Sequence, residues 1–167
     1  MLRSYEAADF DRAVALVGAE LSPRVLVERL ELDWDELARV ARDASEAVLG
    51  EATAERALVV SYGGEAFTAG FLIGIHLPAR GEERVVPTQS RLAAAVDAVQ
   101  QRGRHAVIAD DCDLESVARL ETVYAGELVE SMDVVVGDRE ALRAPVTRIF
   151  EAGLAVGLGA GSGGDGE

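Results

Sequence analysis

Hydrophobic residues are concentrated in one stretch of the chain, Ala57–Leu77, which carries a single formal charge at Glu65. Its first part, residues 57–62, is a short apolar run with β-branched residues, and Gly63 and Gly64 close it. Its second part is apolar on nearly every side, and a segment without a polar face has to be covered by other elements. The rest of the chain is therefore expected to fold around this stretch. Small residues recur at four-residue intervals in its second part, at Ala66, Gly70 and Gly74.

On both sides of this stretch, apolar residues recur at the spacing of one helical face. These stripes predict helices over residues 5–18, 34–50, 88–102 and 113–132. Trp34, at the start of the second helix, is interpreted as a core anchor. Side chains that accept hydrogen bonds precede three of these helices, and glycines follow two of them. We expect caps at Asp33, Thr88 and Asp113 and helix ends at Gly50 and Gly103.

Three short apolar runs alternate with the predicted helices: ALVVSY (57–62), HAVIAD (105–110) and DVVV (133–136). Each is bounded by Gly or Asp, and alternation of helices with short apolar runs is typical of α/β units. We therefore predict an α/β fold, with a small parallel sheet of about three strands flanked by helices and an N-terminal helical extension.

The alternative is an all-α helical bundle. In that fold, residues 53–77 and residues 88–109 would each form one long helix, because their apolar residues roughly keep helical spacing. Gly63-Gly64 and Gly103 weigh against it, since each Gly inside a helix costs about 1 kcal/mol relative to Ala. The α/β fold is thus the main prediction, and the bundle stays open beside it.

The length of the chain, 167 residues, suits one domain with a substantial core. We predict a single globular domain over residues 1–156, made of a helical N-terminal part (1–50) and the α/β part (51–156). Residues 157–167 are rich in Gly and polar, and we expect them to form a disordered tail.

The charge balance is strongly acidic: 30 acidic and 16 basic residues give a formal net charge of −14. Every basic residue is Arg, and neither Lys nor Asn occurs. This composition resembles that of proteins from salt-accumulating archaea, in which high salt screens the self-repulsion of an acidic surface. We therefore expect a halophilic, archaeal protein. Nucleic acid is not an expected partner, because phosphate binding needs a clustered positive surface.

Cys112 is the only cysteine, which excludes an internal disulfide and fits a reducing cytoplasm. The stretch Ala57–Leu77 is long enough to cross a membrane, but Gly63-Gly64, Glu65 and His76 dilute its apolar character. We therefore expect a cytoplasmic protein without a membrane partner.

Several chemistries are excluded by residues that the sequence lacks. Without Lys there is no Walker-A lysine, no Schiff-base lysine and no anchor for pyridoxal phosphate. One Cys and two distant His residues do not supply a conventional structural zinc site. No G-x-S-x-G elbow and no G-x-G-x-x-G fingerprint occurs. Whether the protein is an enzyme at all stays open.

The best candidate for a site is acidic. In the α/β fold, Asp110 and Asp111 follow one strand, Asp138 follows the next, and the Gly63-Gly64 turn follows another. Open sheets bind ligands at such carboxyl ends. We predict Asp110 and Asp111 as ligands of Mg²⁺, and Gly63, Gly64 and Asp138 as contacts to a phosphorylated ligand. The competing interpretation is that acidic residues around Asp113 only cap a helix and charge the surface.

Two functions follow. The first is binding of a phosphorylated metabolite or nucleotide, with Mg²⁺ as a possible cofactor, at the carboxyl ends of the strands. The alternative is a non-catalytic interaction or assembly module, in which the apolar face of residues 67–75, with its small residues, packs against another subunit. A homo-oligomer is one form that such an assembly takes.

Overall fold

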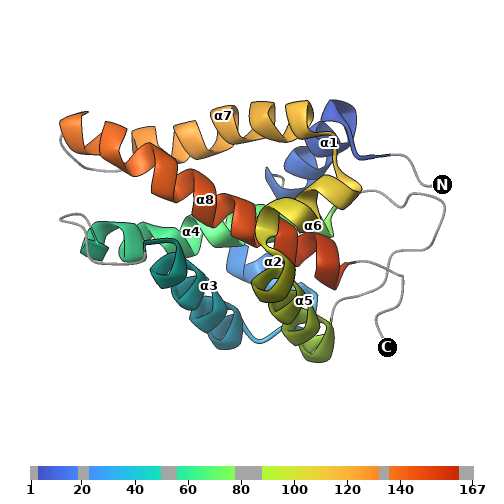
Figure 1. Ribbon diagram of the computed structural model, residues 1–167. Helices are drawn as coiled ribbons and strands as arrows, with labels where there is room; N and C mark the ends of the chain where they lie inside the picture. The colour runs from blue at the N-terminus through green and yellow to red at the C-terminus, as the bar shows by residue number, and fades with distance from the viewer. Residues whose placement is uncertain (1–3, 19–22, 50–55, 78–87, 132–135, 162–167) are drawn as a thin grey trace.

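The computed structural model describes residues 4–18, 23–49, 56–77, 88–131 and 136–161. Within these ranges, the side chains of residues 48–49, 56–62, 125, 131 and 136–141 are outside the description. Every regular element in the described residues is an α-helix (Figure 1). For this part of the chain the α/β prediction is therefore wrong, and the all-α alternative is confirmed. The helices are α1 (Ala7–Gly18), α2 (Pro23–Arg29), α3 (Trp34–Leu49), α4 (Arg56–Ile75), α5 (Gln89–Arg102), α6 (Arg104–Asp111), α7 (Leu114–Ser131) and α8 (Val136–Ala160).

The segments predicted as strands are helical wherever they are described. HAVIAD lies in α6, ALVVSY lies in α4, and Val136 opens α8, while residues 133–135 lie outside the described residues. A short apolar run fits a buried helix as well as a buried strand, so periodicity alone does not separate the two. Here the packing of helices against one another outweighs the preference of β-branched residues for strands.

The glycines that weighed against a long helix behave in two ways. Gly63 lies inside α4, where an added Cβ would be 2.1 Å from the Oγ of Ser45 on α3. The missing side chain lets α3 and α4 approach closely, and this packing offsets the helix cost of about 1 kcal/mol. Gly103 instead ends α5 as predicted: its φ is 89°, and its N–H bonds to the carbonyl of Val99. Residues 88–109 are therefore divided between two helices.

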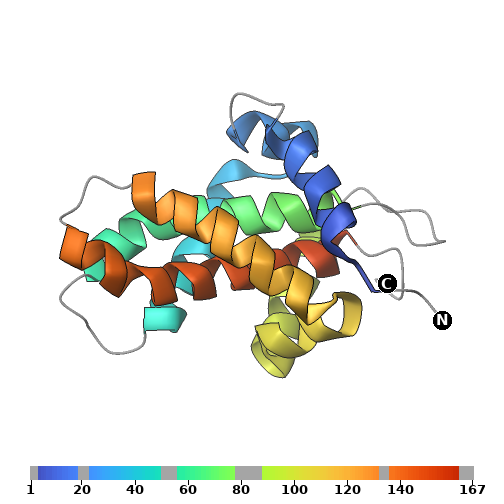
Figure 2. The same cartoon turned by 90° about the horizontal axis from the view of Figure 1, so that it is seen from above.

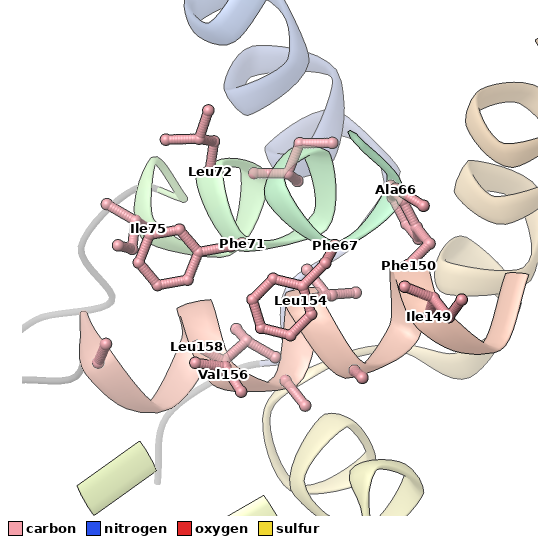
Figure 3. Packing of buried hydrophobic residues seen from close by; sticks show 14 of the residues in the cluster. Ala66, Phe67, Phe71, Leu72, Ile75, Ile149, Phe150, Leu154, Val156 and Leu158 are labelled. Carbon is pink, nitrogen blue, oxygen red and sulfur yellow. The ribbon is translucent and has the colours of Figure 1, made fainter. Parts of the chain in front are cut away.

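Helices α4 and α8 form the centre of the molecule. The residues that make contact advance in the same direction along both helices, so α4 and α8 are parallel (Figure 3). The contacting pairs, in order, are Gly63 with Ile149, Phe67 with Gly153, and Phe71 with Gly157. A Cβ added at Gly153 would lie 2.1 Å from the carbonyl oxygen of Phe67, and one at Gly70 would lie 2.3 Å from that of Phe150. The two backbones thus touch through glycines.

This pairing covers the apolar face of α4 within one chain. Phe67, Phe71 and Leu72 of α4 and Leu154 of α8 are all fully buried. The face formed by residues 67–75, considered above as a subunit interface, is therefore already packed against α8. Among the described helices, none has both the length and the apolar character needed to cross a membrane. A cytoplasmic location stays a prediction.

The other helices cover the central pair from two sides (Figures 1 and 2). Helices α3 and α5 pack on one side, while α7 lies on the other against α8 and α1. Helix α6 packs against α5 and α8, and α2 packs against α3 and α4. Buried residues from every one of these helices belong to one hydrophobic cluster, among them Phe10, Val27, Leu37, Phe67, Leu92, Ile108, Val129 and Phe150.

The helix caps expected from the sequence are present where they are described. Thr88 accepts a hydrogen bond from the N–H of Arg91, and Asp33 accepts one from the N–H of Asp35. Asp113 likewise accepts from the N–H of Ser116 and so caps α7. The expected end at Gly50 lies outside the described residues.

Both ends of the described chain are tied to the body of the protein. The N–H of Tyr5 donates to the carbonyl of Asp111, and the N–H of Asp113 donates to the carbonyl of Tyr5, each at 2.8 Å. At the other end, α8 continues to Ala160, and Leu158 is buried in the core. The disordered tail was expected from residue 157, but its first residues extend α8 because they pack against α4.

Candidate functional site

The predicted metal ligands, Asp110 and Asp111, lie in the last turn of α6. The Asp110 carboxylate is exposed and forms an ion pair with the guanidinium of Arg102 on α5. Asp113, close by, is occupied with capping α7. Among the described residues, no three Asp, Glu, His or Cys side chains gather as metal ligands would. Binding of Mg²⁺ at Asp110 and Asp111 stays a prediction.

The predicted ligand contacts are not at strand ends. Gly63 and Gly64 lie in the interior of α4, where their N–H groups belong to the helix rather than to a helix start. Asp138 lies in the first turn of α8, and its side chain is outside the described residues. The sheet edge that was expected to bring these residues together with Asp110 does not exist in the described part of the chain. The geometry behind a shared phosphate site is therefore missing, because it depended on parallel strands.

The structure instead contains a groove between α3 and α5, with a volume of about 480 Å³. Its floor is formed by Phe67 of α4 with Ala152 and Val156 of α8. Small and medium-sized apolar residues form its walls: Val40, Ala44 and Ala47 on α3, and Leu92, Ala93, Val96 and Val99 on α5. We call this feature the α3/α5 groove. Its size is within the range of ligand-binding clefts.

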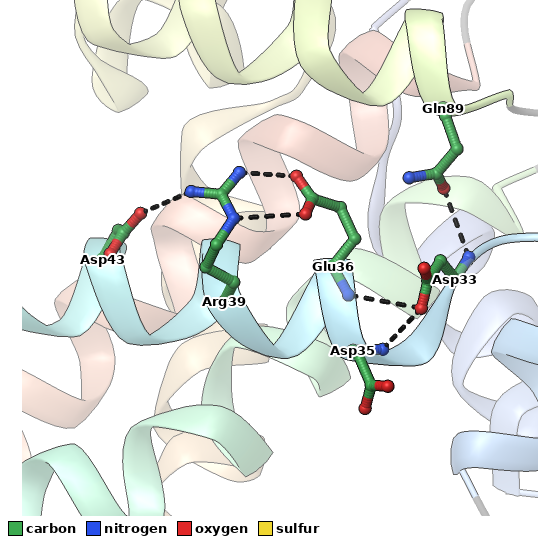
Figure 4. A network of polar contacts seen from close by, with 6 residues as sticks. All are labelled: Asp33, Asp35, Glu36, Arg39, Asp43 and Gln89. Carbon is green, nitrogen blue, oxygen red and sulfur yellow. Dashed lines mark hydrogen bonds and ion pairs between the residues drawn. The ribbon is translucent and has the colours of Figure 1, made fainter.

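Charged residues follow the rim of the α3/α5 groove along α3 (Figure 4). Arg39 lies between two carboxylates, with ion pairs of 2.5 Å to Glu36 and 3.0 Å to Asp43. The hydrogen bond from Arg39 lowers the pKa of Glu36. At the start of α5, the side-chain oxygen of Gln89 accepts a hydrogen bond from the N–H of Asp33 at 3.2 Å, which ties the two walls together at one end. Asp97 adds a carboxylate on the α5 side.

At one end of the groove, Arg104 connects to a pair of carboxyl groups that lies between α7 and α8. The Nε of Arg104 donates to Oε1 of Glu151 at 3.0 Å, and Nε2 of His105 lies 3.4 Å from the same oxygen. The carboxyl group of Glu121 on α7 is in hydrogen-bonding contact with that of Glu151. Oε1 of Glu121 is buried and has no hydrogen-bond partner among the described residues. We call Glu121 and Glu151 the carboxyl pair.

The carboxyl pair has strongly perturbed acidity. Burial, the hydrogen bond to Glu151 and repulsion from Glu151 raise the pKa of Glu121 to about 8, against the opposing effect of Arg104. Burial acts to raise the pKa of Glu151 too, but hydrogen bonds from Glu121 and Arg104 lower it below its ordinary value. Two carboxylates in contact resist ionising together, so the opposite directions of the two pKa shifts favour one shared proton on the pair.

A second cavity, of about 550 Å³, is lined by residues of α1, α2, α3, α4 and α7. Its lining includes Trp34, Thr68, Tyr124 and Leu128. Trp34 packs against the core, as interpreted from the sequence, and the guanidinium carbon of Arg24 lies 5.9 Å from the centre of its ring. The only tryptophan of the chain therefore lines the same cavity as Tyr124 and Leu128 of α7.

Sequence reasoning missed both the α3/α5 groove and the carboxyl pair. One signal was available, because Glu151 is the only charged residue in the apolar segment 149–160. No pattern in the sequence connects it with Glu121 or Arg104, which lie far away along the chain and meet only when α6, α7 and α8 pack. The groove, the cavity and the carboxyl pair are the features from which a function can be argued. The chain matches no family model, no curated protein and no solved structure.

Proposed function

We propose that this chain is a non-catalytic interaction module that holds an amphipathic helix of a partner protein in the α3/α5 groove. The α3/α5 groove itself carries this proposal: a mainly apolar groove between two helices, floored by the central pair and partly open to solvent. Amphipathic helices bind in such grooves by inserting side chains at positions i, i+3 or i+4, and i+7.

The place of the interaction differs from the one that the sequence suggested. The face of α4 formed by residues 67–75 is buried against α8 and is not available to a partner. The α3/α5 groove is accessible and lies between two helices that do not pack closely along its length, so apolar side chains of a partner would complete the packing there. The assembly alternative is thereby retained, on another surface.

The charges on the rims of the α3/α5 groove favour a partner helix that carries basic residues. Glu36 and Asp43 on one rim and Asp97 on the other outnumber the arginines that line the groove, Arg39 and Arg104. A helix with Arg or Lys residues beside its apolar stripe is complementary to these rims. A second copy of this chain fits less well, because each copy carries a formal net charge of −14.

The test uses a designed helical peptide with Leu at the i, i+3, i+4 and i+7 positions and Arg at the flanks of the stripe. A peptide with Glu at the flanks and a peptide with scrambled Leu positions are the comparisons. Fluorescence anisotropy of the labelled peptides measures affinity at about 0.2 M and about 2 M KCl, because salt screens the rim charges but not apolar burial. We expect the Arg-flanked peptide to bind most tightly, with an advantage over the Glu-flanked peptide that shrinks in high salt.

Neighbouring alanines on α5 give a matched pair of variants. Ala93 and Ala94 are both exposed, but only Ala93 lines the groove. Ala93→Trp should fill the groove and weaken peptide binding about tenfold or more, which is about 1.4 kcal/mol. Ala94→Trp should leave the affinity within about twofold. Equal weakening by both variants, or no binding of any peptide to the parent protein, would overturn the proposal.

A further inference from the structure

We propose that the carboxyl pair is a proton-dependent joint, which holds α7 against α8 while the pair carries a proton and loosens α7 when that proton is lost. This inference concerns the contact of α8 with α7. Arg104 also lines one end of the α3/α5 groove, but the inference does not depend on what binds there. It rests on the contact between Glu121 and Glu151, on the charges around them and on what α7 covers.

The charges around the carboxyl pair do not neutralise two carboxylates. Arg104 on α6 supplies one permanent positive charge, at 3.0 Å from Glu151. His105, also on α6, lies 3.4 Å from the same oxygen, but its side chain is 72% exposed, and water weakens its effect. Glu121 and Glu151 are the carboxyl groups that α7 and α8 contribute. Tyr124 on α7, which packs on Phe150, has its pKa raised by burial and by the charge of Glu127. One carboxylate is therefore compensated, and a second one in contact with it is not.

Burial makes the second charge costly. The Glu151 side chain is only 13% exposed, and Oε1 of Glu121 is buried without a hydrogen-bond partner in the described structure. A protonated Glu121 donates its hydrogen bond to Glu151, so one proton turns a repulsive contact into an attractive one. The raised pKa of Glu121, about 8, agrees with this geometry, and burial is its largest cause.

Proton linkage gives the direction of the effect. The pKa of Glu121 is raised from 4.5 in the folded protein, so between about pH 4.5 and about pH 8 the folded state binds a proton that the unfolded state has lost. The stabilisation that this proton provides is fully present below pH 4.5 and is lost as pH rises to about 8. The lowered pKa of Glu151 acts in the opposite sense, only at acidic pH below its ordinary value. Mildly alkaline pH is thus where the joint opens.

The structural consequence is movement of α7. Besides the carboxyl pair, α7 is held by apolar contacts such as that of Tyr124 with Phe150, whose ring centres are 5.9 Å apart. Tyr124 and Leu128 of α7 also line the cavity that contains Trp34. Trp34 is partly buried in this cavity. When α7 loosens, the cavity widens and the indole gains exposure, so the emission of the single tryptophan reports the position of α7.

The experiment follows the full-length protein from pH 5 to pH 9.5 in about 2 M KCl, which screens general surface repulsion but acts less on a half-buried pair. Nuclear magnetic resonance of ¹³C-labelled Glu carboxyl groups measures ionisation, and Trp34 emission measures exposure. We expect one carboxyl resonance to titrate near pH 8 and the Trp34 emission to shift to longer wavelength over the same range. Both changes should be absent in Glu121→Gln, since the amide donates to Glu151 at every pH.

Glu127→Gln, an exposed change of the same kind on α7, is the matched control and should keep both transitions. The joint is refuted if every Glu carboxyl of the parent protein titrates below about pH 6. It is equally refuted if Trp34 emission changes alike in the parent protein and in Glu121→Gln. The carboxyl titration needs only the parent protein, so it can refute the joint even if Glu121→Gln does not fold.

Discussion

Helix α8 makes two interfaces of opposite kind. Toward α4 it presents Gly153 and Gly157, and the two backbones meet without side chains between them. Toward α7 it presents Glu151, which forms the carboxyl pair with Glu121 and an ion pair with Arg104. The first interface depends on shape alone, because only the absence of a Cβ permits it. The second depends on charge, and therefore on pH.

This difference divides the molecule into a fixed part and an adjustable part. Close backbone packing leaves no room for alternative arrangements, so α4 and α8 should stay together under all conditions in which the protein is folded. A carboxyl pair with one compensating cation changes its energy when a single proton leaves. Substitutions in the two interfaces should accordingly differ in size and in their dependence on pH.

The largest effect is expected in the fixed part, at Gly153. In Gly153→Ala, the new Cβ would lie 2.1 Å from the carbonyl oxygen of Phe67, and backbone atoms cannot move aside as a flexible side chain can. Because α4 and α8 would have to separate, we expect a loss of about 3 kcal/mol or more in the free energy of unfolding. Urea unfolding followed by circular dichroism measures this loss, which should be the same at pH 6 and pH 9.

Gly64→Ala is the control for this prediction. Gly64 also lies inside a helix of the central pair, but a Cβ added there meets nothing within 4 Å. This variant should gain about 0.5–1 kcal/mol, the ordinary benefit of replacing Gly by Ala within a helix. If Gly153→Ala were as stable as Gly64→Ala, the parallel contact of the two backbones would be wrong.

The amphipathic parts of the fold were predictable from the sequence, while the arrangement of its most apolar part was not. The caps at Asp33, Thr88 and Asp113 and the end at Gly103 are set by local hydrogen bonds, and local sequence reveals them. The apolar runs were assigned to strands because a segment that is buried on all sides shows no hydrophobic periodicity, and its length and flanking residues then decide the prediction. Gly63 and Gly64 weighed against a helix, although the missing side chain of Gly63 lets α3 and α8 approach α4.

The candidate site was less predictable, for a related reason. Asp110 and Asp111 were conspicuous in the sequence because they are adjacent, but adjacent residues on a helix point in different directions. Glu121, Glu151 and Arg104 come from three helices and become a unit only through tertiary packing. The same holds for the α3/α5 groove, whose floor comes from α4 and α8. Local patterns identify helices, whereas sites between helices require their packing.

A smaller but pH-dependent effect is expected in the adjustable part, at Arg104. Its side chain is 26% exposed and compensates the charge of Glu151. Arg104→Gln should lower the free energy of unfolding at neutral pH by about 2 kcal/mol, because a mostly buried carboxylate loses its cation. Arg104 lowers the pKa of Glu121, so its removal should move the alkaline transition of the carboxyl pair to higher pH. Urea unfolding and the ¹³C carboxyl titration measure these two changes.

Arg119→Gln changes the net charge by the same amount on the exposed surface of α7 and serves as the control for Arg104. It should leave the titration of the carboxyl pair in place and change stability little. A transition that moved equally in both variants would point to net charge rather than to the contact between Arg104 and Glu151.

The smallest effect on stability is expected at Arg39, on the rim of the α3/α5 groove. Its ion pairs with Glu36 and Asp43 are as short as that of Arg104, yet its side chain is 59% exposed, and water screens exposed pairs. Arg39→Gln should therefore leave the midpoint of urea unfolding unchanged within error at either pH. It should instead strengthen binding of the Arg-flanked peptide, because removing a cation leaves the rim more acidic. A clear loss of stability in Arg39→Gln would contradict this prediction. It would mean that the exposed ion pairs of Arg39 stabilise the fold as much as the less exposed ion pair of Arg104 does.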